Sequence, residues 1–311
     1  MSARPRVLAV VGPTACGKSA LALALAARVG GEIINCDSTA VYRGFDIGTD
    51  KVPPGDRQSV PHHLIDVADP TDVYTAARFA REASGVIRDV LARGRTPIVV
   101  GGTGLYYRAL TRGLFPGPGA DDALRARLER VAERRGAARL HAMLARVDPA
   151  SAARLPPRDR KRVVRALEVF RTTGRTLTDH FAATVSPIAD CEVATVAVSM
   201  PLDAIAARAA RRVEAQFARG LVAEVETLLA RGVPPDARPF GGLVYRQVLE
   251  MRAGVRDLAA TRTLIALENR RYARRQLVWF RREPGLRWIE GPGEAPDALD
   301  RAWEALVACP G

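Results

Sequence analysis

An eight-residue segment near the start of the chain has the composition of a phosphate-binding loop. Residues 12–19 read Gly-Pro-Thr-Ala-Cys-Gly-Lys-Ser and match the pattern G-x-x-x-x-G-K-[ST] at every position. Glycines let backbone N–H groups wrap closely around an anion, Lys18 can bond phosphate oxygens, and the Ser19 hydroxyl can ligate Mg²⁺. We therefore expect a phosphate group, with Mg²⁺ as cofactor, held by Gly12, Thr14, Ala15, Cys16, Gly17, Lys18 and Ser19.

Two further residues with chemical potential follow predicted strands. Asp37 stands where small-molecule P-loop kinases often place the carboxylate that meets the phosphoryl acceptor. Another apolar strand ends in Gly101-Gly-Thr-Gly104, with glycines where a P-loop NTPase usually carries an acidic Mg²⁺ ligand. These residues favour group transfer to a nucleophile near Asp37 over hydrolysis, although Asp37 could instead cap a helix and Thr103 could be only a turn residue.

The elements that must position these residues alternate between strands and helices. The apolar run 7–11 leads into the phosphate loop and the Ala/Leu-rich run 20–27 follows it, which places the glycines at a strand-to-helix turn. Further strands are expected at 32–36, 63–67, 97–100, 192–199 and 286–289, and helices at 74–93, 202–231 and 259–282. Strands separated by helical stretches predict an α/β fold with a parallel sheet flanked by helices.

The middle of the chain breaks this alternation. The stretch 113–119 is rich in Pro and Gly, and residues 121–180 look wholly helical before the strand expected at 192–199. We predict an inserted all-helical domain at 113–188 within a P-loop core formed by residues 1–112 and 189–311.

Size and composition narrow the class of protein. With 311 residues, 48% of them hydrophobic, the chain can bury one large core plus a smaller domain. No apolar run approaches the roughly 20 residues of a membrane span, the N-terminus passes directly into the first strand, and four scattered cysteines include no C-x-x-C pair. We therefore expect a cytoplasmic monomer with no membrane contact.

The net charge of +13 is concentrated in two segments. Residues 112–180 hold sixteen Arg or Lys against eight Asp or Glu, and residues 262–282 hold seven Arg against one Glu. Helical geometry brings Arg158, Arg162 and Arg165 within about 60° of one another, and Arg271, Arg275 and Arg282 within about 40°. Either face alone could be an ordinary solvated surface, but together they predict contact with a nucleic acid.

Several motifs occur in a characteristic order. They are the phosphate loop, Asp37-Ser-Thr-Ala-Val-Tyr-Arg43, Asp46-Ile-Gly-Thr49, Pro61-His-His-Leu-Ile-Asp66, Gly101-Gly-Thr-Gly-Leu-Tyr106, Arg162-Val-Val-Arg-Ala-Leu-Glu168, Gly220-Leu-Val-Ala-Glu-Val225 and Arg271-Tyr-Ala-Arg-Arg-Gln-Leu-Val-Trp-Phe-Arg281. Together, and over essentially the whole chain, they resemble the tRNA dimethylallyltransferases, the tRNA isopentenyltransferase family.

The resemblance implies transfer of a dimethylallyl group from dimethylallyl diphosphate to N6 of the adenosine immediately 3′ of the tRNA anticodon. The phosphate loop and Mg²⁺ would then stabilise the diphosphate leaving group, with Arg208 or Arg212 as a clamp. Asp37 is the expected general base for the N6 proton, and Thr103 is expected to stabilise the bridging oxygen of the scissile C–O bond.

The same resemblance implies where the tRNA binds. The target adenosine would be extruded into a channel between the core and the inserted domain, where it would meet Asp37, Ser38, Thr39, Ala40 and Thr103. Other contacts with the anticodon stem-loop are expected at Arg158, Lys161, Arg162, Val163, Val164, Arg165, Arg271 and Arg275. Two residues depart from the family pattern, because Ala40 and Lys161 stand where Gln is common. The first departure removes an amide that could bond the base, whereas the second keeps a polar donor.

Other residues carry a structural interpretation, and two rival functions stay open. We interpret His62 and His63, adjacent on a strand and so facing opposite ways, as structural, and Tyr272, Trp279 and Phe280 as packing residues. A P-loop kinase would explain the phosphate loop but not the basic segments. An inactive RNA-binding protein would explain the charge but not Lys18, Ser19, Asp37 and Thr103 together.

Overall fold

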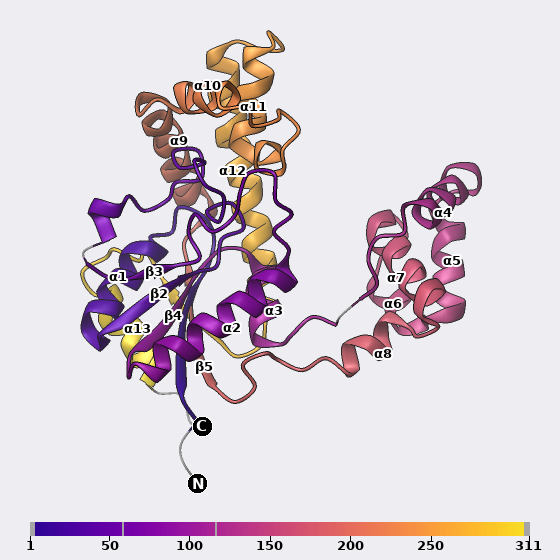
Figure 1. Ribbon diagram of the computed structural model, residues 1–311, viewed down its shortest axis with the longest axis horizontal. Helices are drawn as coiled ribbons and strands as arrows, with labels where there is room; N and C mark the ends of the chain where they lie inside the picture. Colours follow the sequence, from indigo (N-terminus) through magenta and orange to yellow (C-terminus); the bar gives the residue numbers. More distant parts are fainter. Residues whose placement is uncertain (1–3, 58, 116, 308–311) are drawn as a thin grey trace. The chain divides into compact units, whose positions relative to one another are not determined.

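The chain folds into two compact units (Figure 1). Each unit has its own hydrophobic core. A computed structural model describes residues 4–57, 59–115 and 117–307. One unit comprises Met1–Thr111 with Pro187–Gly311, and the other comprises Arg112–Ser186. The second unit corresponds to the inserted domain, for which the sequence predicted the bounds 113–188.

A six-stranded parallel sheet organises the first unit, which confirms the predicted α/β class. The strand order is β3-β2-β4-β1-β5-β6 and every pairing is parallel. The strands are β1 (Arg6–Val11), β2 (Gly31–Asn35), β3 (His62–His63), β4 (Thr96–Gly101), β5 (Glu192–Ser199) and β6 (Leu286–Glu290).

Helices cover both faces of this sheet, as continuous apolar strands require. Along β1, Leu8 and Val10 pack in the cluster that contains α1 (Lys18–Val29) and α13 (Ala298–Val307). Val7, Ala9 and Val11 pack on the other side, in the cluster that contains α2 (Ala76–Ala92) and α3 (Gly104–Thr111). The remaining helical elements of this unit are η1 (Pro54–Arg57), α9 (Leu202–Ala218), α10 (Leu221–Ala230), η2 (Arg238–Gly241), α11 (Leu243–Arg252) and α12 (Leu258–Phe280).

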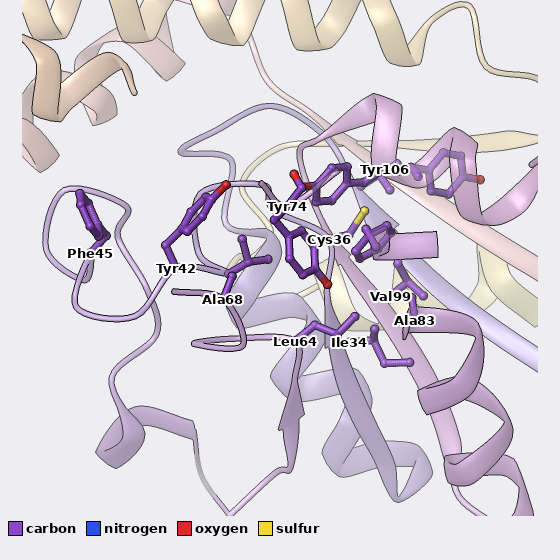
Figure 2. Packing of buried hydrophobic residues seen from close by; sticks show 14 of the residues in the cluster. Ile34, Cys36, Tyr42, Phe45, Leu64, Ala68, Tyr74, Ala83, Val99 and Tyr106 are labelled. Carbon is purple, nitrogen blue, oxygen red and sulfur yellow. The ribbon is translucent and has the colours of Figure 1, made fainter. Parts of the chain in front are cut away.

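Aromatic packing anchors the two segments that carry the candidate catalytic residues. Figure 2 shows Cys36, the residue directly after β2, in the same cluster as Tyr106 of α3. The Tyr106 ring stacks on Phe79 with 4.4 Å between ring centroids. Because Asp37 follows Cys36 and Thr103 precedes α3, this core fixes the backbone on either side of both residues.

Several predicted boundaries were wrong for identifiable backbone reasons. The strand expected at 63–67 stops at His63, because Leu64 (φ 61°) and Asp66 (φ 57°) adopt left-handed conformations that end an extended chain. The helix expected at 202–231 is two helices, since Gly220 (φ 94°) interrupts it. Helices α3, α11 and α13 were missed.

The second unit is all-helical, as predicted. It consists of α4 (Asp122–Arg135), α5 (Ala137–Val147), α6 (Pro149–Arg154), α7 (Arg160–Thr173) and α8 (Leu177–Ala182). Leu128, Leu140, Leu144, Val163 and Leu167 are among the residues of its core. Side chains cap four of these helices, because Asp121, Asp148, Asp159 and Thr176 each accept the backbone N–H of the residue three positions on. Nowhere in the described ranges is a helix long and apolar enough to span a bilayer.

Candidate active site

The predicted phosphate loop joins β1 to α1 and lies at the wall of a cavity of about 520 Å³. Two of its residues have left-handed backbones, Ala15 (φ 61°) and Gly17 (φ 85°), and α1 begins directly after Gly17. Gly12 (φ 144°) has no room for a side chain, because an added Cβ would lie 2.5 Å from the carbonyl oxygen of Val198. Since the first N–H groups of a helix have no partner within it, the start of α1 presents donors and partial positive charge to the cavity.

Arginines of α9 form the wall facing the phosphate loop. Arg208 donates from Nε to the carbonyl oxygen of Ala15 at 2.7 Å and from its terminal nitrogen to Glu294. Arg212 donates to the hydroxyl of Thr14 at 2.5 Å and to Asp50 at 3.0 Å. Both arginines line the cavity, as does exposed Arg211, which sequence reasoning missed. Three guanidinium groups therefore add positive potential to one small volume.

Asp37 and Thr103 lie together at the carboxyl ends of β2 and β4. The Ser38 backbone N–H donates to the Thr103 hydroxyl oxygen at 3.0 Å, and the Thr103 N–H donates to the Cys36 carbonyl at 3.2 Å. Asp37 Oδ1 accepts hydrogen bonds from the backbone and hydroxyl of Thr39. Asp37 is therefore held in a turn, not at a helix N-terminus, and the structure brings it beside Thr103.

The glycines around Thr103 are explained by what packs on them. A Cβ on Gly101 would lie 2.1 Å from the Cys36 carbonyl oxygen, one on Gly102 would lie 2.3 Å from Gln276, and one on Gly104 would lie 2.2 Å from the Trp279 ring. Gln276 is buried, accepts the Thr14 N–H at 2.8 Å and donates to the Gly102 carbonyl at 2.9 Å. Helix α12 thereby links the phosphate loop to the loop that carries Thr103.

A second cavity of about 510 Å³ adjoins the first. Both cavities are lined by Thr14, Asp37, Thr49, Asp50, Arg212 and Tyr272. Arg271 and Arg275 line only the second, together with Ser38, Thr39 and the polar side chains of Gln216, Glu268 and Asn269. Asp37 and Tyr272 thus stand where an anion-binding cavity meets a polar one.

Tyr272 is more than the packing residue that the sequence suggested. Burial raises the pKa of its hydroxyl, the nearby Asp37 carboxylate adds to the rise, and Thr103 and Gln276 interact with the hydroxyl. Its ring lines both cavities. Ile265 lies seven positions before Tyr272 on α12 and is completely buried. The spacing of residues along the helix therefore could not show that Tyr272, unlike Ile265, faces a cavity.

Other predicted site residues have specific places in this unit. Ser19 lines the first cavity and is exposed, and Ala40 lines it from a buried position. Lys18 Nζ donates to the Pro13 carbonyl at 2.5 Å. His63 bonds Glu32 at 2.7 Å, whereas His62 bonds the Val60 carbonyl at 2.8 Å and also lines the first cavity. No group of three His, Cys, Asp or Glu residues suited to a metal occurs in the described part of the chain.

The basic face predicted in the second unit needs correction. Asp159 caps α7, so exposed Arg158 precedes the helix and does not belong to a helical stripe. Val163 and Val164 are buried in the core of this unit, so their side chains are not available to a ligand. Arg165 bonds Glu168 at 2.7 Å and the Pro118 carbonyl at 3.0 Å. Lys161 and Arg162 remain exposed.

Comparison with known proteins agrees with these features. The sequence model of the IPP transferase family matches residues 40–283. A tRNA dimethylallyltransferase of Geobacter sulfurreducens is 46% identical over 289 residues, which are 93% of either chain. The crystal structure of the full-length tRNA isopentenylpyrophosphate transferase of Bacillus halodurans is 34% identical, with a TM-score of 0.71 over 97% of this chain and 94% of that one. A eukaryotic dimethylallyltransferase acting on tRNA, 24% identical, shares the fold with a TM-score of 0.74 over 98% of this chain and 77% of its own.

Proposed function

This chain belongs to the IPP transferase family, and we propose that it transfers a dimethylallyl group from dimethylallyl diphosphate to N6 of the adenosine 3′-adjacent to the tRNA anticodon, releasing diphosphate. One observation carries the proposal furthest: Asp37 lines both cavities. The phosphate-loop cavity suits an anionic donor, and the polar cavity suits a base. A carboxylate between them can take a proton from the acceptor as the new bond forms.

The donor's diphosphate is assigned to the first cavity. Its oxygens would accept hydrogen bonds from the backbone of Ala15 to Ser19 and from Lys18, with Arg208 and Arg212 opposite. Groups that hold the departing diphosphate more tightly than the intact ester lower the barrier to C–O cleavage. Arg208 and Arg212 also donate hydrogen bonds to the phosphate loop, so they fix the position of the loop as well as supplying positive charge.

Mg²⁺ fits the chemistry of the residues at this cavity. Mg²⁺ prefers oxygen ligands and is commonly held by few protein groups together with substrate phosphates. The Ser19 hydroxyl would hold it. When bound, the ion neutralises charge that develops on the departing diphosphate.

Asp37 and Thr103 divide the proton chemistry. The adenine N6 amine is conjugated into its ring and is a poor nucleophile, so removal of its proton by Asp37 must accompany C–N bond formation. Thr103 Oγ1 accepts from the Ser38 N–H, which leaves its own proton available for the bridging oxygen of the donor. In the structure Thr103 Oγ1 donates to Ser38 Oγ at a long 3.3 Å and also interacts with the Tyr272 hydroxyl, and the bridging oxygen of the donor would replace these partners.

The RNA is held mainly by charge. Arg271 and Arg275 line the second cavity, and in the other unit Arg158, Lys161 and Arg162 are exposed. Phosphate contacts position an RNA, and extrusion of the target base from the stacked loop would let its N6 amine reach Asp37. We expect the reaction to take place in the cytoplasm, catalysed by a monomer.

Transfer of label tests this function. The protein, Mg²⁺, unmodified tRNA and dimethylallyl diphosphate labelled in the allyl group are incubated, and radioactivity in RNA is measured. The proposal requires label at N6 of the adenosine beside the anticodon. ATP hydrolysis or phosphorylation of a metabolite without label in RNA would support a kinase instead, and tRNA binding without either reaction would support an inactive RNA-binding protein.

A further inference from the structure

One carboxylate holds three consecutive backbone N–H groups of the segment 46–50. Glu224 Oε2 accepts from the N–H groups of Asp46 at 3.0 Å and Ile47 at 2.7 Å, and Oε1 accepts from that of Gly48 at 3.4 Å. The Tyr245 hydroxyl donates to Glu224 Oε1 at 2.6 Å. Four donors therefore converge on the two oxygens of a single side chain from α10.

The four hydrogen-bond donors around Glu224 require a side chain that only accepts hydrogen bonds. A carboxylate offers about four lone-pair sites and no hydrogen, whereas the amide of a glutamine would place an NH₂ among the donors. Burial raises the pKa of Tyr245 and the adjacent Glu224 carboxylate raises it further, so the phenol stays protonated and remains a donor. The segment is thus tied to α10 and α11 through the side chain of Glu224.

Packing fixes the same segment from other sides. A Cβ on Gly48 would lie 2.6 Å from the Tyr245 ring, so the backbone rests directly on that ring. Gln216, buried in α9, donates to the Ile47 carbonyl at 3.1 Å. The end of the segment, Thr49 and Asp50, lines both cavities.

The far end of the segment reaches the anion site. Asp50 Oδ2 accepts from Arg212 at 3.0 Å, and its Oδ1 lies 4.0 Å from Arg219. The same guanidinium of Arg212 donates to the hydroxyl of Thr14 in the phosphate loop. A continuous series of contacts therefore runs from Glu224 through the segment to Asp50, then to Arg212 and the phosphate loop.

We propose that Glu224 and Asp50 are positioning residues for Arg212, which they hold in the place where it grips the donor's diphosphate. This inference rests on the proposed function for the identity of the donor. Neither residue need touch the donor itself. Loss of either would leave Arg212 charged but free to swing away from Thr14, and affinity for diphosphate would fall while tRNA binding stayed unchanged.

Calorimetric titration with inorganic diphosphate and Mg²⁺ tests this without any need for turnover. We compare the wild type with Glu224→Gln and Asp50→Asn, and with Glu226→Gln as the matched control. Glu226 lies on the same helix, is exposed, and pairs only with Arg252 at 3.5 Å among the described residues. The dissociation constant for diphosphate should rise about ten- to hundredfold in the first two variants, the range expected when one hydrogen bond to a charged group is lost. The control should match the wild type.

Steady-state kinetics separate positioning from general damage. In Glu224→Gln and Asp50→Asn, kcat/KM for dimethylallyl diphosphate should fall by the same factor, because Arg212 holds the departing diphosphate as well as the bound donor, and KM for tRNA should stay close to wild type. The dissociation constant for diphosphate in the double variant should be no higher than that of the single variant with the larger increase, because both residues act through Arg212. Unchanged diphosphate affinity in folded Asp50→Asn would overturn the inference, as would a parallel rise in KM for tRNA. Wild-type protein that binds diphosphate but transfers no label would contradict the proposed function and leave the titration result to decide this inference.

Discussion

Asp37 Oδ1 accepts two hydrogen bonds from Thr39, one from the backbone N–H at 2.8 Å and one from the hydroxyl at 2.7 Å. No hydrogen bond from the described part of the chain reaches Oδ2 of the same carboxylate. The turn fixes the side chain with one oxygen engaged and one oxygen available as a base.

Asp37→Asn should abolish transfer and spare tRNA binding. The amide keeps an oxygen for Thr39 but cannot take the N6 proton, so the single-turnover rate should fall roughly 10²–10⁴-fold. Filter binding should show tRNA affinity close to wild type. A matched control exists because Asp69 Oδ1 accepts from the backbone and hydroxyl of Thr71 at 3.0 and 2.7 Å. Asp69→Asn disturbs an equivalent turn and should leave the rate unchanged; equal losses of transfer and tRNA binding in Asp37→Asn would make Asp37 structural.

Gly104→Ala should destabilise the first unit, whereas Gly85→Ala should stabilise it. A Cβ on Gly104 would lie 2.2 Å from the Trp279 ring, which must then move, and overpacking of this kind costs about 1–3 kcal/mol. Gly85 lies exposed within α2 with nothing within 4 Å of an added Cβ, so alanine there should gain about 0.5–1 kcal/mol. Urea unfolding measures both changes, and a loss of stability in Gly85→Ala would count against this account.

Glu168 should make the second unit sensitive to acid. Burial alone would raise the pKa of its carboxyl, but hydrogen bonds from Arg125, Arg165 and the Asp121 N–H outweigh burial and lower it. Because the folded pKa lies below the unfolded value of about 4.5, ionised Glu168 stabilises the fold at neutral pH, and this contribution is lost as the pH falls through the folded pKa.

Glu168→Gln should therefore cost most at neutral pH. Removal of a carboxylate buried between arginines costs about 3 kcal/mol, the lower end of the usual range because both arginines reach solvent. The difference from wild type should shrink when unfolding is repeated below pH 4.5. Glu133→Gln, an exposed change on α4, serves as the control. A difference that stays constant with pH would contradict the assignment.

Lys161→Ala with Arg162→Ala should weaken tRNA binding in a salt-dependent way. Each phosphate contact that is lost should lower the slope of log affinity against log salt by about one. Calorimetry at several salt concentrations gives the slope, and diphosphate binding should not change. Arg130→Ala with Arg134→Ala removes the same charge from an exposed part of α4. Equal effects of the two pairs would indicate general attraction without a defined contact.

The sequence predicted features formed by neighbouring residues, and it missed contacts between residues that lie far apart in the chain. The phosphate loop could be recognised because its residues are contiguous, and the sheet because buried parallel strands read as apolar runs. Gln276, in contrast, lies 262 residues from Thr14, and its bond to the Thr14 N–H leaves no pattern in either segment. The anchoring of Arg212 by Asp50 likewise depends on how α9 packs.

Helix α7 shows a second limit. Angular spacing grouped Arg158 with Arg162 and Arg165, but the cap at Asp159 starts the helix after Arg158, and Glu168 draws Arg165 into an ion pair. Helix boundaries depend on such caps, which composition marks only weakly. The valines of the family motif are buried by the core of the second unit, a fact that only the tertiary fold contains.

The link from Gln276 to Thr14 and Gly102 has a consequence during synthesis. A nascent chain that has left the ribosome only as far as the inserted unit holds the phosphate loop and Asp37, but not the amide that joins the two loops. The anion site is completed only when α12 emerges. A nascent chain without α12 therefore lacks a complete site for an allylic diphosphate, and it can bind this ligand only after α12 has been synthesised and has folded.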